Sequence, residues 1–140
     1  MPARTSTATW EGTLREGSGS FVVGDDYFEG EVSFVSRFED DDEGKTNPEE
    51  LIGAAHATCF SMAFSAELER ADAEPRRIDT SATVHIEDLE ITTIELETEA
   101  EVSGIDEDEF QEIAEGAKEN CPVSKALGGV ETITLDATLV

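Results

Sequence analysis

Positive charge is scarce in this 140-residue sequence, which has nine lysines and arginines against 34 aspartates and glutamates, a formal net charge of −25. Proteins that bind nucleic acid need a basic face for the phosphates, so the deficit argues against nucleic acid and disfavours anionic membranes. The acids are spread from Glu11 to Asp136, and we interpret them as a solvated coat on a folded core. Our hypothesis is a cytoplasm of very high salt, where screening limits the repulsion.

Long apolar runs and cysteines are also few. No stretch reaches the roughly 18 uninterrupted apolar residues of a membrane span, and residues 1–12 have no apolar segment of the signal-peptide type. We therefore expect a cytoplasmic protein, and the length predicts a single domain over residues 1–140. In that compartment two cysteines rarely form a structural disulfide, which leaves redox chemistry, metal binding or simple burial open.

The hydrophobic periodicity predicts an α+β domain. We expect strands at 6–14, 20–23, 31–38, 78–86, 91–102 and 131–139, and helices at 48–71, 107–119 and 123–127. The two central strands alternate as strands of an antiparallel sheet do.

The long helix has a clear start, with Asn47 as N-cap, Pro48 at the first helical position and Glu50 in the capping-box position. No charged residue occurs from Leu51 to Ala66, so this helix is expected to be buried nearly all round. The broad side assigned to the core comprises Leu51, Ile52, Ala55, Cys59, Met62, Ala63 and Ala66.

The two cysteines are the first candidates for chemistry. Cys59 lies mid-helix in the uncharged run, where an inert core residue is the ordinary interpretation, because burial raises the pKa of a thiol. Cys121 follows a helix and precedes a proline, where a packed apolar residue is not especially expected. Such a pair suits a peroxidatic and a resolving cysteine, in which sulfenic acid on the first condenses with the second. Two unrelated cysteines remain the alternative.

A reactive thiolate needs a cation, and Arg37 is the only basic residue inside a predicted apolar strand. It is a candidate to face the sulfur, and an edge-strand arginine that reaches solvent is the alternative. Glu49 is the candidate carboxylate for Arg37. It lies about three turns from Cys59 and about 80° away around the helix axis. An acidic residue merely favoured at a helix N-terminus fits Glu49 equally well.

His56 shares a helix face with Cys59, and cysteine–histidine pairs act as nucleophiles in proteases. A satisfied core or interface histidine is the better interpretation, because no oxyanion-hole motif is visible. A zinc site from His56, Cys59, His85 and Cys121 is disfavoured, since the metal-binding spacings are missing and His85 is on the polar side of its strand.

Several motifs together resemble the OsmC/Ohr family of thiol-dependent hydroperoxide reductases, most closely its osmotically inducible protein C branch. They are WEG at 10–12, SRFE at 36–39, TNPEELIGAAHATCFSMA from Thr46, SGID at 103–106, CPVSKAL from Cys121 and the terminal ITLDATL. The resemblance implies an OsmC-like fold, with antiparallel sheets packed on a long central buried helix, in an intertwined homodimer with active sites at the subunit interface. It implies that Cys59 is peroxidatic and Cys121 resolving, with Arg37 orienting thiolate and peroxide and Glu49 holding Arg37.

The implied activity is the reduction of organic hydroperoxides to alcohols, through a Cys59 sulfenate and a Cys59–Cys121 disulfide, in oxidative-stress defence. No cofactor or metal is expected, and an external dithiol or lipoylated reductant would recycle the enzyme. The uncharged surroundings of Cys59 favour alkyl or fatty-acid hydroperoxides over hydrogen peroxide. Two alternatives stay open: a non-catalytic redox sensor or binding module that uses the same cysteines, and an acidic scaffold with inert thiols.

Overall fold

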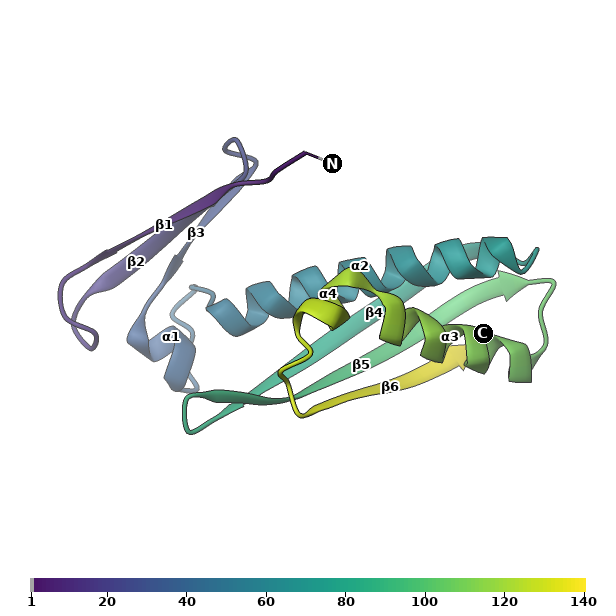
Figure 1. The fold of residues 1–140 in the computed structure, drawn as a ribbon. Coiled ribbons are helices and arrows are strands. Elements are labelled where there is room, and N and C mark those ends of the chain that lie inside the picture. The colour runs from purple at the N-terminus through teal and green to yellow at the C-terminus, as the bar shows by residue number, and fades with distance from the viewer. Residues whose placement is uncertain (1) are drawn as a thin grey trace. The chain divides into compact units, whose positions relative to one another are not determined.

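The computed structural model describes residues 2–140, which form two compact units that divide between Leu51 and Ile52 (Figure 1). Helix α2 (Pro48–Arg70) runs through the boundary between them. The expectation of a single domain over residues 1–140 stays a prediction.

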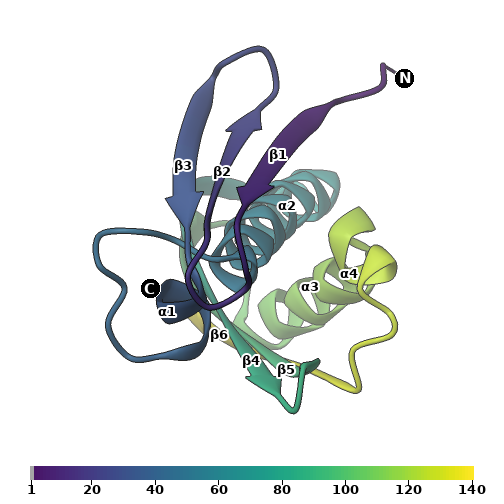
Figure 2. The same ribbon diagram turned by 90° about the vertical axis from the view of Figure 1, so that its left-hand side faces the viewer.

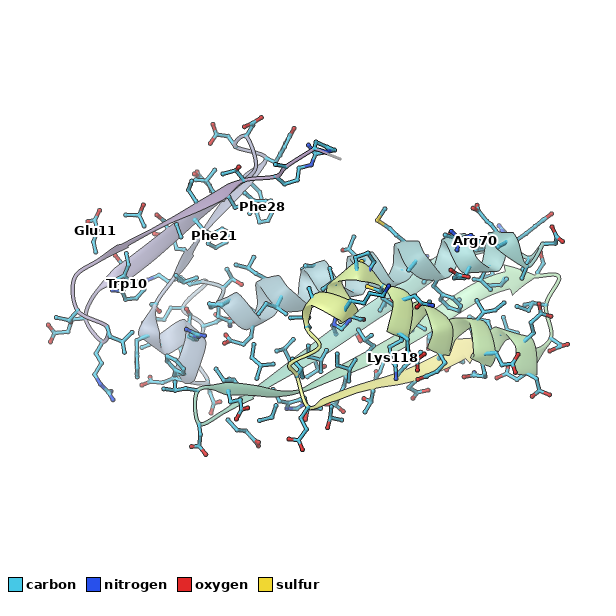
Figure 3. The ribbon with its side chains drawn as sticks, viewed as in Figure 1. Trp10, Glu11, Phe21, Phe28, Arg70 and Lys118 are labelled. Atoms are coloured by element: carbon cyan, nitrogen blue, oxygen red, sulfur yellow. The ribbon has the colours of Figure 1, made fainter. Side chains whose placement is uncertain are left out.

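The N-terminal unit contains a three-stranded antiparallel sheet in the order β1-β2-β3. Its strands are β1 (Ser6–Glu11), β2 (Ser18–Val23) and β3 (Phe28–Val32). Phe21 and Phe28 lie side by side on neighbouring strands with their rings nearly perpendicular and 6.2 Å apart (Figure 3). Such edge-to-face pairs add to the stability that the buried ring area alone supplies.

The strand expected at 31–38 is wrong over most of its length, because Phe34–Phe38 form the short helix α1. The Ser33 hydroxyl accepts a hydrogen bond from the backbone N–H of Ser36 at 3.0 Å, and the Ser36 hydroxyl accepts one from the N–H of Ser33 at 2.8 Å. This reciprocal capping box starts a helix where alternation alone suggested a strand. Arg37 therefore lies on a helix, and its interpretation as an edge-strand residue is wrong.

The C-terminal unit is an α+β layer, which confirms the predicted class. Its elements after α2 are β4 (Glu74–Glu87), β5 (Glu90–Ser103), α3 (Glu107–Asn120), α4 (Pro122–Ala126) and β6 (Thr132–Leu139). The sheet has the order β4-β5-β6, and α2 and α3 lie along one of its faces (Figures 1 and 2). The β5–β6 pair is parallel rather than antiparallel, because α3 and α4 form the crossover between these two strands.

The core of this unit lies between the helices and the sheet. Phe64 on α2 contacts Phe60 on the same helix and Phe110 on α3, with ring centroids 5.5 and 5.3 Å apart. The core also contains Leu68, Ile94, Leu96, Ala100, Ala114 and Ala117, all at most 1% exposed. Lys118 on α3 reaches β6, where its Nζ donates to the carbonyl of Ile133 at 3.4 Å (Figure 3).

The side of α2 that packs on the sheet differs from the one expected. His56, Phe60, Phe64 and Leu68 are fully buried, and Gly53 brings the helix close to β4. A Cβ at Gly53 would lie 3.3 Å from the carbonyl oxygen of Ala82, closer than most such contacts.

The opposite side of α2 is exposed in the single chain, so the expectation that the helix is buried nearly all round is wrong there. Ala54, Ala55, Thr58 and Met62 are exposed, the last of them by 69%. We call these four residues the outer side of α2. Among residues 2–140, α2 is the one helix long and apolar enough to cross a membrane, and one side of it packs on the sheet.

Candidate active site

The start of α2 is held in a network of hydrogen bonds with α1. The Asn47 side chain accepts from the backbone N–H of Glu50 at 2.8 Å, as its predicted N-cap role requires. It also donates to the carbonyl of Ser36 at 3.0 Å, and the Ser36 hydroxyl donates to the carbonyl of Thr46 at 2.8 Å. The Glu50 carboxylate accepts from the Thr46 hydroxyl and the Asn47 amide. These bonds join the two helices where Arg37 and Glu49 lie.

Arg37 and Glu49 form an ion pair across this junction. The Nε and Nη2 atoms of Arg37 donate to the same carboxylate oxygen, Oε1, of Glu49 at 3.1 and 2.9 Å. Glu49 is 7% exposed, whereas the Arg37 side chain is 38% exposed and its guanidinium also lies over the ring of Phe38. A planar guanidinium anchored in this way keeps a defined orientation while N–H groups stay free.

Cys59 and Cys121 come together in the C-terminal unit. Cys59 lies midway along α2 and is half-buried, while Cys121 lies between α3 and α4 and is fully buried. Both are free thiols, and each side chain acts on the pKa of the other, so the two side chains lie close together. The structure therefore places the two sulfurs within reach of one another although 62 positions separate the residues in the sequence.

The two thiols respond to this environment in opposite directions. Burial raises the pKa of Cys59, and so does its hydrogen bond to Cys121, while the backbone N–H of Val123 opposes this. Burial also acts to raise the pKa of Cys121. Nearby polar groups outweigh this effect and lower the pKa of Cys121: they are the Cys59 thiol, the hydroxyl and backbone N–H of Ser124, and the N–H of Val123. Within residues 52–140 a negative charge is therefore better stabilised on Cys121 than on Cys59.

No lysine or arginine of residues 52–140 contributes to either shift.

His56 is neither exposed nor fully satisfied. Its Nε2 lies 2.7 Å from the hydroxyl oxygen of Ser124, and its Nδ1 has no partner among the described residues. Burial lowers the pKa of His56. The expectation of a satisfied core histidine is therefore correct for burial and for one ring nitrogen.

The disfavoured zinc arrangement receives no support from the described part of the chain, where no group of three or more histidine, cysteine and acidic residues could hold a metal. His85 is exposed and pairs with Glu95 on the neighbouring strand, on the polar side that the sequence indicated.

Comparison with known proteins places this geometry in a family. Residues 40–136 match the family of OsmC-like proteins. Peroxiredoxin OsmC of Escherichia coli K12 is 44% identical over 137 residues, which cover 94% of this chain and 93% of that protein. The chain belongs to the OsmC-like family.

Further matches agree with this assignment. Organic hydroperoxide resistance protein-like 1 of Staphylococcus saprophyticus is 30% identical over 114 residues, covering 79% of this chain and 81% of that protein. The crystal structure of an OsmC-like protein from Mycoplasma pneumoniae superposes with a TM-score of 0.76 at 18% identity, covering 99% of this chain and 98% of that one. The latter supports the fold alone.

In this OsmC-like protein the four residues expected at the site form two pairs, Arg37 with Glu49 and Cys59 with Cys121. Ser124 was not among the residues expected at the site, yet it pairs with His56 and lies three residues after Cys121. The signal was present, because Ser124 lies in the CPVS motif that carried the resemblance.

Proposed function

We propose that this OsmC-like protein is a thiol-dependent peroxidase that reduces organic hydroperoxides to alcohols in oxidative-stress defence. The observation that carries the proposal is the pair of neighbouring free thiols formed by Cys59 and Cys121. Relatives named peroxiredoxin OsmC and organic hydroperoxide resistance protein support it. The whole chain, residues 1–140, would act as one functional domain.

The difference in solvent exposure between the two cysteines suggests their roles. Cys59 is half-buried and Cys121 is fully buried, so a hydroperoxide reaches Cys59 first. Cys121 is then the resolving cysteine, which attacks from inside the core. This assignment needs Cys121 to stay protonated while Cys59 reacts as a thiolate.

Arg37 is the cation that we propose for the Cys59 thiolate, with Glu49 as the carboxylate that orients it. The lack of a contributing cation within residues 52–140 supports this assignment. The fixed, partly exposed guanidinium of Arg37 supports it as well. A positive charge near the sulfur would draw the negative charge of the pair onto Cys59 and stabilise the departing alkoxide.

The reaction then balances in three steps. The Cys59 thiolate attacks the distal oxygen of the hydroperoxide, the O–O bond breaks, and the alkoxide leaves and takes up a proton to become the alcohol. Sγ of Cys121 next attacks the Cys59 sulfenic acid, forming the S–S bond and releasing water. An external dithiol reduces the disulfide by exchange and is itself oxidised. No cofactor takes part.

The substrate class follows from the apolar character around Cys59. The outer side of α2 exposes Ala54, Ala55 and Met62 within five residues of this cysteine. An alkyl chain gains free energy by covering such surface, whereas hydrogen peroxide does not. We expect a larger second-order rate constant with cumene hydroperoxide than with hydrogen peroxide, and the reverse order would contradict the assignment.

The same outer side supports the proposal of a homodimer. Its small and apolar side chains are exposed on a helix that already packs its other side on the sheet, and large exposed apolar surfaces mark interaction sites. A Met62→Glu substitution should dissociate the dimer in sedimentation experiments. The exposed Glu69→Gln variant of the same helix is the control and should stay dimeric.

The reductant is proposed to be a dithiol, either free or on a lipoylated protein, in a cytoplasmic setting. Steady-state consumption of cumene hydroperoxide with dihydrolipoamide or with thioredoxin separates the two kinds of electron donor. The acidic segment from Glu39 to Glu43 would repel an acidic donor protein, so a small dithiol should be less sensitive to added salt than a protein donor.

Turnover decides between the peroxidase and a redox sensor that uses the same cysteines. Both predict a Cys59–Cys121 disulfide, so its detection does not distinguish them. A peroxidase consumes many equivalents of hydroperoxide when dithiol is supplied, and Cys59→Ser abolishes this. A sensor consumes about one equivalent and stops, and an acidic scaffold forms no disulfide.

A further inference from the structure

Arg15 is an arginine that the proposed reaction does not use. The sequence has six arginines, and the four that form ion pairs with acidic side chains are Arg37, Arg70, Arg76 and Arg77. Arg15 is exposed and forms no ion pair with any carboxylate of residues 2–140, although Glu16 is the next residue. A guanidinium that stays unpaired in so acidic a protein is available to an anion from solution.

An aromatic ring of α1 holds the Arg15 side chain in place. The guanidinium carbon Cζ of Arg15 lies 4.5 Å from the ring centroid of Phe34, which is a cation–π contact. Phe34 packs in turn on Phe38, with the two ring centroids 5.1 Å apart. The side chain of Arg15 donates no hydrogen bond to any of residues 2–140, so its five N–H groups stay available while the ring restrains it.

The turn between β1 and β2, which carries Arg15, is ordered by Thr13. The Thr13 carbonyl accepts hydrogen bonds from the backbone N–H of Gly17 at 2.8 Å and from Nε1 of Trp10 at 3.3 Å. The Thr13 hydroxyl accepts from the backbone N–H of Glu16 at 3.3 Å. These bonds lie on both sides of Arg15 in the sequence, so they restrain its backbone beside α1 (Figure 2).

Each of the two neighbouring rings of α1 contacts one guanidinium. Arg15 lies over Phe34, and Arg37 lies over Phe38 with its Cζ 5.1 Å from the ring centroid. The guanidinium of Arg37 is bound to the carboxylate of Glu49, whereas that of Arg15 has no such partner among the described residues. This part of the N-terminal unit therefore combines aromatic surface with one paired and one unpaired cation.

We propose that Arg15 binds a carboxylate of the substrate and so selects hydroperoxides of organic acids over neutral hydroperoxides. A carboxylate binds a guanidinium through two parallel N–H···O bonds, which need the planar fork that Arg15 has free. Phe38 is 36% exposed and Leu14, next to Arg15, is 62% exposed, so apolar surface is available to the hydrocarbon part of the substrate. The inference rests on the proposed function, in which Arg37 faces the peroxide group of the same molecule.

The net charge of the protein gives Arg15 a specific task. A formal charge of −25 repels an approaching carboxylate, and an unpaired cation at the binding surface opposes this repulsion locally. A neutral hydroperoxide is subject to neither effect. The carboxylate takes no part in the chemical steps given above, so Arg15 is a specificity-determining residue rather than a catalytic one.

The experiment compares linoleic acid hydroperoxide with its methyl ester, which has the same hydrocarbon chain and peroxide group but no charge. Second-order rate constants for the oxidation of Cys59 are measured by rapid mixing, below the micelle concentration and at about pH 8, where the free acid is ionised. We expect Arg15→Gln to lower the ratio of the acid rate constant to the ester rate constant about tenfold. That is the effect of one charge-assisted contact at an exposed position.

Arg4→Gln is the matched control. Arg4 is exposed and also lacks an ion pair within residues 2–140, so its substitution changes the net charge equally. It should keep the acid-to-ester ratio within about twofold of wild type. An equal fall of the ratio in Arg4→Gln would show that net charge alone favours the acid, and would overturn the inference. So would an unchanged ratio in Arg15→Gln with both substrates slowed alike, which is the result that a purely structural role of Arg15 predicts.

A binding measurement without peroxide separates this inference from the proposed function. Trp10 is the only tryptophan of the chain, and its indole N–H is bonded to the turn that carries Arg15, so its fluorescence reports on this turn. Linoleic acid and methyl linoleate are titrated against this fluorescence in a Cys59→Ser background. We expect the acid to act at about tenfold lower concentration than the ester, and Arg15→Gln to remove the difference.

The outcomes of the two measurements are distinct. No response of Trp10 to the acid, or equal responses to acid and ester, would overturn the inference about Arg15 alone. A missing turnover of both hydroperoxides by wild-type protein would overturn the proposed function alone, because the fluorescence titration needs no reaction.

Discussion

Arg37 donates two hydrogen bonds to a single oxygen of Glu49, and the second oxygen of that buried carboxylate has no partner among the described residues. The ion pair therefore fixes the direction of the guanidinium through one carboxylate oxygen, and the other N–H groups of Arg37 stay available. In the proposed reaction, those groups are the ones that would face the sulfur and the peroxide.

Replacing either member of this pair should slow the oxidation of Cys59. Arg37→Lys keeps the charge but loses the planar fork, and Glu49→Gln loosens the anchor. We expect each to lower the second-order rate with cumene hydroperoxide about 10- to 100-fold, the range of one charge-assisted hydrogen bond. Rapid mixing under single-turnover conditions measures this rate. Asp40→Asn removes an exposed carboxylate three residues after Arg37 and should change the rate less than about twofold; an equal loss would mean that general charge matters rather than the anchor.

Cys121→Ala should make Cys59 easier to ionise. In the wild type, the hydrogen bond to Cys121 and the negative charge that Cys121 can carry both raise the pKa of Cys59. Removing that sulfur removes both causes, so the pKa of Cys59 falls and more thiolate is present at a given pH. The pH profile of the first oxidation should therefore move to lower pH, by up to about one unit. Trapping the persistent sulfenic acid with dimedone measures this profile, and a displacement to higher pH would contradict the effect of Cys121 on the pKa of Cys59.

The packing of α2 on the sheet predicts where the C-terminal unit loses stability. Phe64 is fully buried and contacts aromatic rings on both α2 and α3. Phe64→Ala should lower the free energy of unfolding by about 3–5 kcal/mol, through lost burial and the cavity that remains. Denaturant titration measures this difference. Leu89→Ala is the control, because Leu89 is 83% exposed and its truncation should cost less than about 0.5 kcal/mol.

The elements predicted correctly are those in which the hydrophobic pattern and the capping residues match the way the element packs. Strands β4 and β5 alternate in and out as expected, and Asp106 caps α3 through the N–H of Glu109. The error at α1 arose because the capping box of Ser33 and Ser36 competes with an alternating apolar pattern, and only the local hydrogen bonds decide between them.

The error about α2 has a different cause. An uncharged helix has no polar side to orient it, so periodicity could not show whether Ala55 and Met62 or Phe60 and Phe64 face the sheet. Large aromatic side chains bury more area than alanines, and the structure turns them inward. The pairing of Cys59 with Cys121 was predicted from the family resemblance, because hydrophobic periodicity carries no information about two residues that are 62 positions apart. Ser124 was missed for the same reason.

The outer face of the β4-β5-β6 sheet predicts a strong salt dependence of stability. Asp79 lies directly opposite Glu99, and Glu97 lies directly opposite Asp136, so like charges face one another across both strand pairs. Such pairs destabilise a sheet, and arginines pair with only part of this face, as Arg77 does with Asp79. Raising KCl from about 0.1 M to about 1 M shortens the Debye length from about 10 Å to about 3 Å and weakens the repulsion.

We therefore expect the thermal unfolding temperature to rise with KCl, and Glu97→Gln to reduce that rise by removing one charge from the facing pairs. Glu107→Gln is the matched control, because Glu107 lies in the first turn of α3, where a negative charge is favourable rather than repelled. It should keep the salt dependence of the wild type. Calorimetric unfolding at a series of KCl concentrations measures all three proteins. Equal unfolding temperatures in low and high salt would show that repulsion on the acidic face does not affect stability. That result would contradict the hypothesis of a high-salt cytoplasm.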